Sequence, residues 1–196
     1  KTYPRIGGSF RKTSTEKEMK RIGFLFLFYF ALLNVRAQQT QLEVQFLYEG
    51  KIIELGKHYN YLPLNDSVSF DALKCYLSQI TLIDTKNQRI SLEKKHFLVD
   101  VENPQSCVIN LPNSLQIASL QLTVGVDSTS NAQAIMTGDL DPINGMYWAW
   151  QSGFINWKIQ GKCTALQTRN HVFQYHIGGF LPPFQSTRNI LLENPN

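Results

Sequence analysis

Four histidines are the conventional nitrogen ligands that this 196-residue chain offers a metal ion: His58, His96, His171 and His176. Neutral imidazole suits copper and zinc. His171 and His176 are five residues apart, so along one uninterrupted strand their side chains face opposite ways. No two histidines have the spacing of a local chelating pair, so a metal site would have to be assembled across strands. A histidine in a strand more often hydrogen-bonds to the backbone than binds a metal.

All three tryptophans, Trp148, Trp150 and Trp157, lie in one segment that follows a turn-forming sequence. Residues 138–145, GDLDPING, predict a tight loop, because the proline presets φ and the Asn-Gly pair tolerates positive φ. We expect a strand over residues 146–159, with Trp148 and Trp150 on one face and a bulge permitted at Gly153. Clustered aromatic residues more often form a core or a stacking surface than a reactive centre.

Acidic residues of two adjoining loops form a second candidate metal site. Asp127, Asp139 and Asp141, together with Asn144, could supply the oxygen ligands that calcium takes. The alternative, which we favour, is that Asp127-Ser128 and residues 139–144 form hydrogen bonds from side chain to backbone within their turns. The sequence has no nucleophile elbow and no glycine-rich phosphate loop, so we expect a protein that is not an enzyme.

The three cysteines, Cys75, Cys107 and Cys163, are widely spaced and lack the short paired spacing of a zinc site. In an oxidising compartment one pair could form a disulfide, and the sequence leaves open which pair. For Cys75 we expect a small buried hydrophobic residue, because it lies in an alternating strand pattern.

The N-terminal segment predicts export. Met19 precedes Lys20-Arg21, an apolar run over residues 22–33 and a small residue at Ala37, which is the pattern of a signal peptide cleaved before Gln38. The run is too short for a transmembrane helix, which needs about 20 apolar residues. An uncut anchor is the less favoured alternative. Residues 1–18 are expected to be a disordered upstream extension, and the protein to be periplasmic or secreted, with no transmembrane span after cleavage.

The charge of the chain depends on this leader. Residues 1–37 hold 8 of the 19 basic and 2 of the 15 acidic residues, which leaves 11 basic and 13 acidic residues and a net charge of −2 in residues 38–196. No basic stripe with interleaved aromatic residues is present, so the sequence excludes a nucleic-acid-binding protein.

Alternating apolar and polar residues dominate residues 38–196, a length that suits one domain. Many short strands, and no long amphipathic helical window, predict a single antiparallel β-sandwich or a partly closed barrel over residues 41–192. A short helix is expected at 129–136. The predicted strands are 42–48, 67–70, 73–78, 79–84, 89–92, 97–101, 107–111, 119–126, 146–159, 171–177 and 189–192.

Five sequence blocks resemble the MbnP-like family of periplasmic copper-binding proteins, which are associated with methanobactin. They are LKCYLSQITLID (73–84), HFLVDVE (96–102), LTVGVDSTSNA (122–132), the tryptophan segment (138–161) and FQYHIGGF (173–180). The match spans most of residues 41–192. Members of that family tend to continue with further strands, so this chain is expected to be either a short member or truncated after Asn196.

The resemblance implies a copper-binding or copper-handling protein, in which histidines act with a tryptophan that a partner dihaem peroxidase-like enzyme oxidises to kynurenine. It implicates His176 as a copper ligand, His96 as the second imidazole, and either Trp148 or Trp150 as the modified residue. The residues themselves leave a second class open: a non-catalytic β-sandwich module whose aromatic cluster is structural or binds a partner or a glycan.

Overall fold

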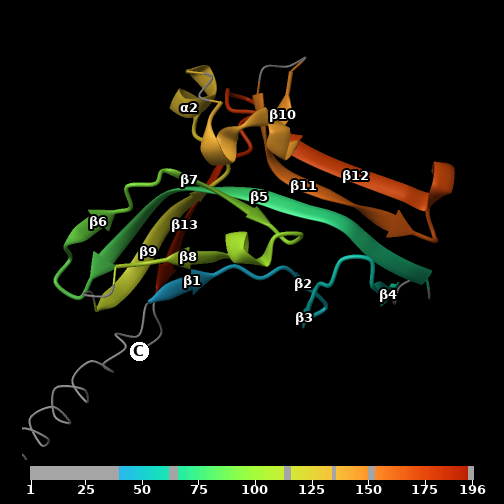
Figure 1. The fold of residues 1–196 in the computed structure, drawn as a ribbon, viewed down its shortest axis with the longest axis horizontal. Coiled ribbons are helices and arrows are strands. Elements are labelled where there is room, and N and C mark those ends of the chain that lie inside the picture. The colour runs from blue at the N-terminus through green and yellow to red at the C-terminus, as the bar shows by residue number, and fades with distance from the viewer. Residues whose placement is uncertain (1–39, 62–65, 113–115, 134–135, 150–152, 194–196) are drawn as a thin grey trace, which may run out of the picture. The chain divides into compact units, whose positions relative to one another are not determined.

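A computed structural model describes residues 40–61, 66–112, 116–133, 136–149 and 153–193 (Figure 1). The predicted upstream extension and signal peptide lie outside these residues and stay predictions. In the part of the chain that is described, no helix has the length and hydrophobicity needed to cross a membrane.

The long strand β5 (Asp66–Asp84) organises the main sheet. Along one of its edges lie β4 (His58–Tyr61), β7 (His96–Asp100) and β6 (Arg89–Ser91). Along the other edge lie β11 (Gly153–Cys163) and β9 (Ile117–Val124). β12 (Val172–Gly178) extends the sheet beyond β11, and β13 (Arg188–Glu193) extends it beyond β9.

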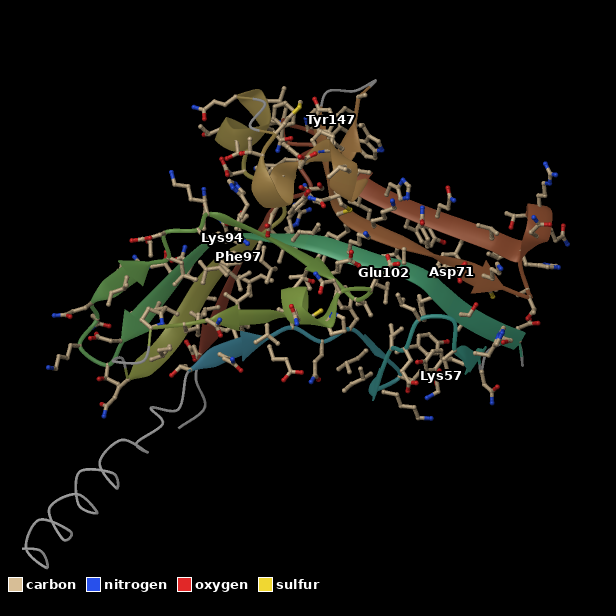
Figure 2. The ribbon with its side chains drawn as sticks, viewed as in Figure 1. Lys57, Asp71, Lys94, Phe97, Glu102 and Tyr147 are labelled. Carbon is tan, nitrogen blue, oxygen red and sulfur yellow. The ribbon has the colours of Figure 1, made fainter. Side chains whose placement is uncertain are left out.

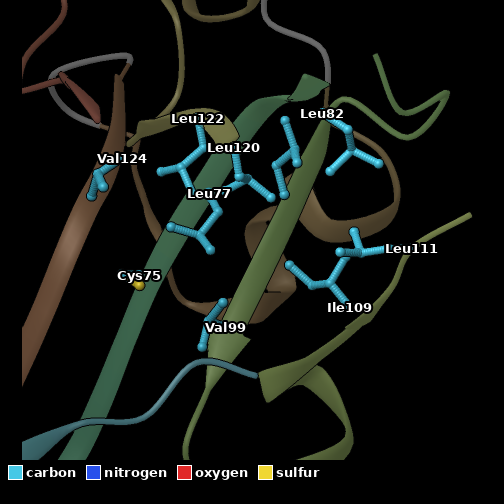
Figure 3. Packing of buried hydrophobic residues seen from close by; sticks show 10 residues of the cluster. Cys75, Leu77, Leu82, Val99, Ile109, Leu111, Leu120, Leu122 and Val124 are labelled. Atoms are coloured by element: carbon cyan, nitrogen blue, oxygen red, sulfur yellow. The ribbon is translucent and has the colours of Figure 1, made fainter. Parts of the chain in front are cut away.

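Two small sheets cover one face of the main sheet (Figure 1). The first pairs β1 (Gln41–Glu43) with β8 (Val108–Asn110), and the second pairs β2 (Leu47–Tyr48) with β3 (Lys51–Ile52). The first small sheet closes a core of aliphatic residues with β5, β7 and β9, and Cys75 lies within it, 1% exposed (Figure 3). The second packs through Tyr48 on a neighbouring cluster that contains Tyr59 and Phe70. All strand pairs described are antiparallel, and the sheets do not close, so the predicted all-β sandwich is confirmed.

A second layer, the cap, packs on the opposite face of the main sheet (Figure 1). It consists of α2 (Ser128–Ala132), the 3₁₀ turns η2 (Gly138–Leu140) and η3 (Pro142–Asn144), and β10 (Tyr147–Trp148). Leu140 and Met146 of the cap bury their side chains against Tyr76 and Phe154 of the sheet. The predicted helix at 129–136 is present and starts one residue earlier, and the structure ends it at Ala132.

Two strand predictions need correction. The predicted strands 67–70, 73–78 and 79–84 form one strand, because Gln79 adopts a φ of 52° and makes a bulge rather than a turn. The predicted continuous strand 146–159 is instead a hairpin in which Tyr147 pairs with Phe154 and Trp148 with Gly153. The alternation of Tyr147 and Trp148 fits either arrangement, because a reversal of the chain preserves a period of two.

The remaining turns are short. η1 (Pro104–Cys107) leads from β7 into β8, and η4 (Arg169–His171) leads into β12.

Candidate functional site

The loop before Trp148 is held as the sequence predicts. Asp141 Oδ1 accepts a 2.9 Å hydrogen bond from the Ile143 N–H, and Asn144 Nδ2 donates to the carbonyl oxygens of Gly138 and Asp139 at 3.3 and 3.1 Å. Gly145 ends η3 in the left-handed region, with φ 68° and ψ 27°. The Asx side chains and this glycine therefore fix the direction in which the chain enters β10.

Two buried asparagines, which no sequence pattern indicates, hold the cap on β11. Asn156 Oδ1 accepts a 2.9 Å hydrogen bond from the Val126 N–H. Asn131 Oδ1 accepts one of 3.1 Å from the Phe154 N–H, while its Nδ2 donates to the Val126 carbonyl at 3.0 Å. Because an unpaired buried amide is costly, these pairings give the cap one position on the sheet.

Trp148 lies against the backbone of β12. A Cβ atom added to Gly178 would come within 2.5 Å of Cζ3 of the Trp148 ring and within 2.6 Å of the Phe154 carbonyl oxygen. Glycine is thus required at position 178 by close packing. Trp150, the other candidate, falls outside the described residues.

Trp148 and His176 line the same surface hollow, which has a volume of about 680 Å³. Gly178 follows His176 by two residues on β12, so His176 and Gly178 face the same side of the sheet. The rest of the hollow is formed by Gly153 and by residues 177–184. We call this the Trp148 hollow. The structure therefore brings together one predicted tryptophan and one predicted histidine.

His176 is engaged by its neighbours on β11. Gln160 Nε2 donates a 2.8 Å hydrogen bond to His176 Nε2, which places the ring proton on Nδ1. Partial burial, and then the charge of Lys158, hold the pKa of His176 below its usual value. At neutral pH the imidazole is accordingly neutral, which is the form that binds metals.

A row of four charged or titratable residues crosses four adjacent strands at this level. Asp100, Lys74, Lys158 and His176 are successive cross-strand neighbours on β7, β5, β11 and β12, and we call them the charged row. Lys74 Nζ contacts Asp100 Oδ2 at 2.7 Å, and Lys158 Nζ donates to the Gly145 carbonyl at 3.1 Å. Burial and the charge of Lys74 lower the pKa of Lys158. Only the strand register reveals this row, which sequence reasoning missed.

His96, the predicted second imidazole, is not brought to His176. His96 lies on β7, opposite Ser78 of β5, so β5 and β11 lie between its strand and β12. Three strand spacings of about 4.8 Å alone separate the two backbones by roughly 14 Å. His96 Nε2 instead contacts Asp127 Oδ2 at 3.0 Å. His96 and His176 could therefore coordinate one metal ion only after a rearrangement of the strands.

Asp127 is the N-cap of α2. Its carboxylate accepts hydrogen bonds from the backbone N–H and the hydroxyl of Ser130, at 2.9 and 2.8 Å. Burial disfavours its charged form, but the hydrogen bonds from Ser130 and His96 outweigh that cost and lower the pKa of Asp127. His96 and Asp127 therefore form a unit that closes the cap onto β7.

The other acidic candidates are engaged separately. Asp139 Oδ2 accepts a 2.7 Å hydrogen bond from the Leu98 N–H and contacts Lys94 Nζ at 2.8 Å, and Figure 2 shows Lys94 beside Phe97. Asp141 caps η3. Within the described ranges, no group of three or more His, Cys, Asp and Glu side chains is poised around a common point. Calcium at Asp127, Asp139 and Asp141 stays a prediction.

The remaining histidines and cysteines make local contacts. His58 Nδ1 lies 2.9 Å from Ser67 Oγ, and His171 Nδ1 donates to the Leu166 carbonyl at 2.7 Å. Cys75, Cys107 and Cys163 are all free thiols in this structure. Burial, and then the proximity of Cys107, raise the pKa of Cys75 to about 12, so this thiol is unreactive at neutral pH.

The other aromatic residues of the tryptophan segment belong to the core. Trp157 packs edge-on against Phe46 with ring centroids 6.1 Å apart, and Tyr147 packs against Phe154 at 5.1 Å. In Figure 2, Tyr147 lies on the cap side of the sheet. The segment therefore presents no continuous aromatic face among its described residues, and Trp148 is the aromatic residue that lines a hollow.

Comparisons with known proteins agree with this architecture. A search of curated protein sequences finds no match. Among solved structures, MbnP from Methylosinus trichosporium is similar in fold, with a TM-score of 0.59 and 15% sequence identity over 81% of this chain and 72% of that one. The model of the MbnP family matches residues 37–194. The chain therefore belongs to the MbnP family.

Proposed function

We propose that this protein is an exported, non-enzymatic copper-binding or copper-handling protein whose site is the Trp148 hollow. The observation that carries the proposal is that Trp148 and His176 line one hollow, where Trp148 rests on Gly178. Membership of the MbnP family supports it. Copper is well served by a neutral imidazole, and His176 is held in that form.

The set of ligands is incomplete before modification. Among the described residues, His176 is the single imidazole at the hollow. Its Nε2 already accepts a hydrogen bond from Gln160, and Lys158 places a positive charge beside it. One neutral ligand next to a cation cannot hold a cupric ion firmly. These residues fit copper only in part, so we expect tight binding to depend on a chemical change at Trp148.

Oxidation of Trp148 to kynurenine would supply that change. Cleavage of the C2–C3 bond of the indole would take one oxygen atom from each of two hydrogen peroxide molecules, whose remaining oxygen atoms leave as water, and hydrolysis of the resulting N-formyl group would release formate. The product carries an aromatic amine and a ketone, both potential ligands. We propose a partner dihaem peroxidase-like enzyme as the catalyst. Trp148 is partly buried rather than enclosed, because it lines an open hollow.

Copper titration tests this function. Wild-type protein with and without the modification, His176→Ala, and the control His58→Ala are compared; His58 is exposed and hydrogen-bonded to Ser67. We expect modified wild type and His58→Ala to bind copper alike, and His176→Ala to bind at least about tenfold more weakly. Equal affinity of His176→Ala and wild type would remove His176 from the site.

Export is tested by N-terminal sequencing of the protein secreted by a bacterial host. The mature chain should begin at Gln38, because Ala37 ends the predicted signal peptide. A chain that retains the apolar run 22–33 would contradict export with cleavage.

A further inference from the structure

We propose that the Trp148 hollow also binds a small amphipathic anion, with an aromatic or aliphatic body against the loop 180–184 and its carboxylate at His176 and Lys158. This inference goes beyond copper and does not depend on it, although both ligands would use His176.

The walls of the hollow are apolar and remain exposed. Trp148, Phe180, Leu181 and Phe184 line it, and the side chains of Leu181 and Phe184 are 59% and 80% exposed. The backbone of this loop is tied down, because the Ser186 N–H donates to the Gly179 carbonyl and the Phe184 N–H to the Leu181 carbonyl. The volume of about 680 Å³ lies within the usual range for small-molecule sites. A two-ring organic body would cover these apolar side chains.

The charged row places a cation, Lys158, opposite His176, which is a lining residue of the hollow. Lys74 is paired with Asp100 at 2.7 Å, while Lys158 has no carboxylate partner within the described part of the chain and donates to the Gly145 carbonyl. Lys158 is nevertheless directly opposite Lys74, and like charges opposite one another destabilise a sheet. An anion beside Lys158 would relieve this repulsion.

His176 connects the cation to the apolar walls. It is the cross-strand neighbour of Lys158 and a lining residue of the hollow. Because its Nε2 accepts from Gln160, the Nδ1–H remains as a donor for a carboxylate oxygen. The arrangement of an apolar body site, an N–H donor and a neighbouring ammonium group favours a monoanion over a neutral compound or a cation.

The test uses 2-naphthoate as the probe, measured by calorimetry on the unmodified protein without copper. Two other compounds separate its parts: 2-naphthalenemethanol keeps the rings and lacks the charge, and acetate keeps the carboxylate charge and lacks the rings. We expect 2-naphthoate to bind and the other two to bind at least about fivefold more weakly, since one charge pair at a partly exposed site contributes roughly 1 kcal/mol. Absence of naphthoate binding, or equal binding of the neutral alcohol, would overturn the proposal.

Variants then locate the site. Lys158→Met and Phe184→Ala should each weaken naphthoate binding about fivefold, Lys158→Arg should restore it, and Lys162→Met, an exposed lysine of the same strand, should leave it unchanged. Thermal melts confirm that each variant is folded. Unchanged affinity in Lys158→Met would also overturn the proposal. A copper titration of the same variants separates anion binding from copper binding, because Lys158→Met should retain copper binding and His176→Ala should lose it.

Discussion

The two histidines that the sequence singles out lie in opposite surroundings. His96 contacts the carboxylate of Asp127, which in turn caps α2, so its ring is held by a charged structural partner. His176 lines an open hollow beside Trp148, and its polar partners in the described part of the chain are the Gln160 amide and the Lys158 ammonium group. Family-like sequence blocks contain both residues. What separates a structural histidine from a candidate ligand is therefore the partner that the fold gives each ring.

The largest expected effect concerns the floor of the Trp148 hollow. Gly178→Val places side-chain atoms where the Trp148 ring and the Phe154 carbonyl lie, and overpacking of this kind costs about 2–4 kcal/mol. Urea unfolding measures the loss, and tryptophan fluorescence reports displacement of the ring. The control is Gly56→Ala. There φ is +75°, and the added Cβ would meet no atom within 4 Å apart from those of its chain neighbours, so only backbone strain of roughly 1 kcal/mol is expected. Equal losses in both variants would contradict close packing at Gly178.

The loop that leads into the hollow gives the next effect. Gly145→Val forces a β-branched residue into φ 68°, which should lower the free energy of unfolding by about 1–3 kcal/mol. Chemical denaturation of both proteins measures the difference. A variant that unfolds like the parent would show that the turn does not require glycine.

The unit formed by His96 and Asp127 should respond to pH. Because the pKa of Asp127 is lowered in the folded protein, its contribution is fully present above the unfolded value of about 4 and is lost as pH falls through the folded pKa. Asp127→Asn should therefore reduce the loss of stability as the pH falls below about 4. Unfolding free energies of both proteins across that range provide the measurement. If the free energies of unfolding of the two proteins changed with pH in parallel, Asp127 would not contribute to the pH dependence of stability.

The smallest expected effect is at His58. Its ring is exposed and hydrogen-bonded to Ser67, so His58→Ala should change stability by less than about 0.5 kcal/mol and leave copper binding unchanged. A thermal melt and a copper titration are sufficient. A marked loss of copper affinity in this variant would move the site away from the Trp148 hollow.

Strand periodicity and turn chemistry predicted the all-β class, the Asx-held loop and the left-handed Gly145 correctly, because these depend on local residue preferences. The reversal between Trp148 and Gly153 was missed, because a hairpin preserves alternation. The continuity of β5 was missed for the opposite reason: the bulge at Gln79 shifts the alternation by one residue, so that Leu77 and Ile80 face the same core. The register that aligns Lys74, Lys158 and His176 depends on pairing between distant strands, which one sequence does not contain. For the same reason, the partner of His96 could not be predicted.

The most direct test of the proposed site is a peptide mass map of the protein, purified from a host that also makes the proposed dihaem peroxidase-like partner. We expect the peptide containing Trp148 to show the gain of one oxygen and loss of one carbon that convert tryptophan to kynurenine, with Trp157, which packs against Phe46, unmodified. An unmodified Trp148, or modification confined to another tryptophan, would contradict the assignment of Trp148 to the copper site.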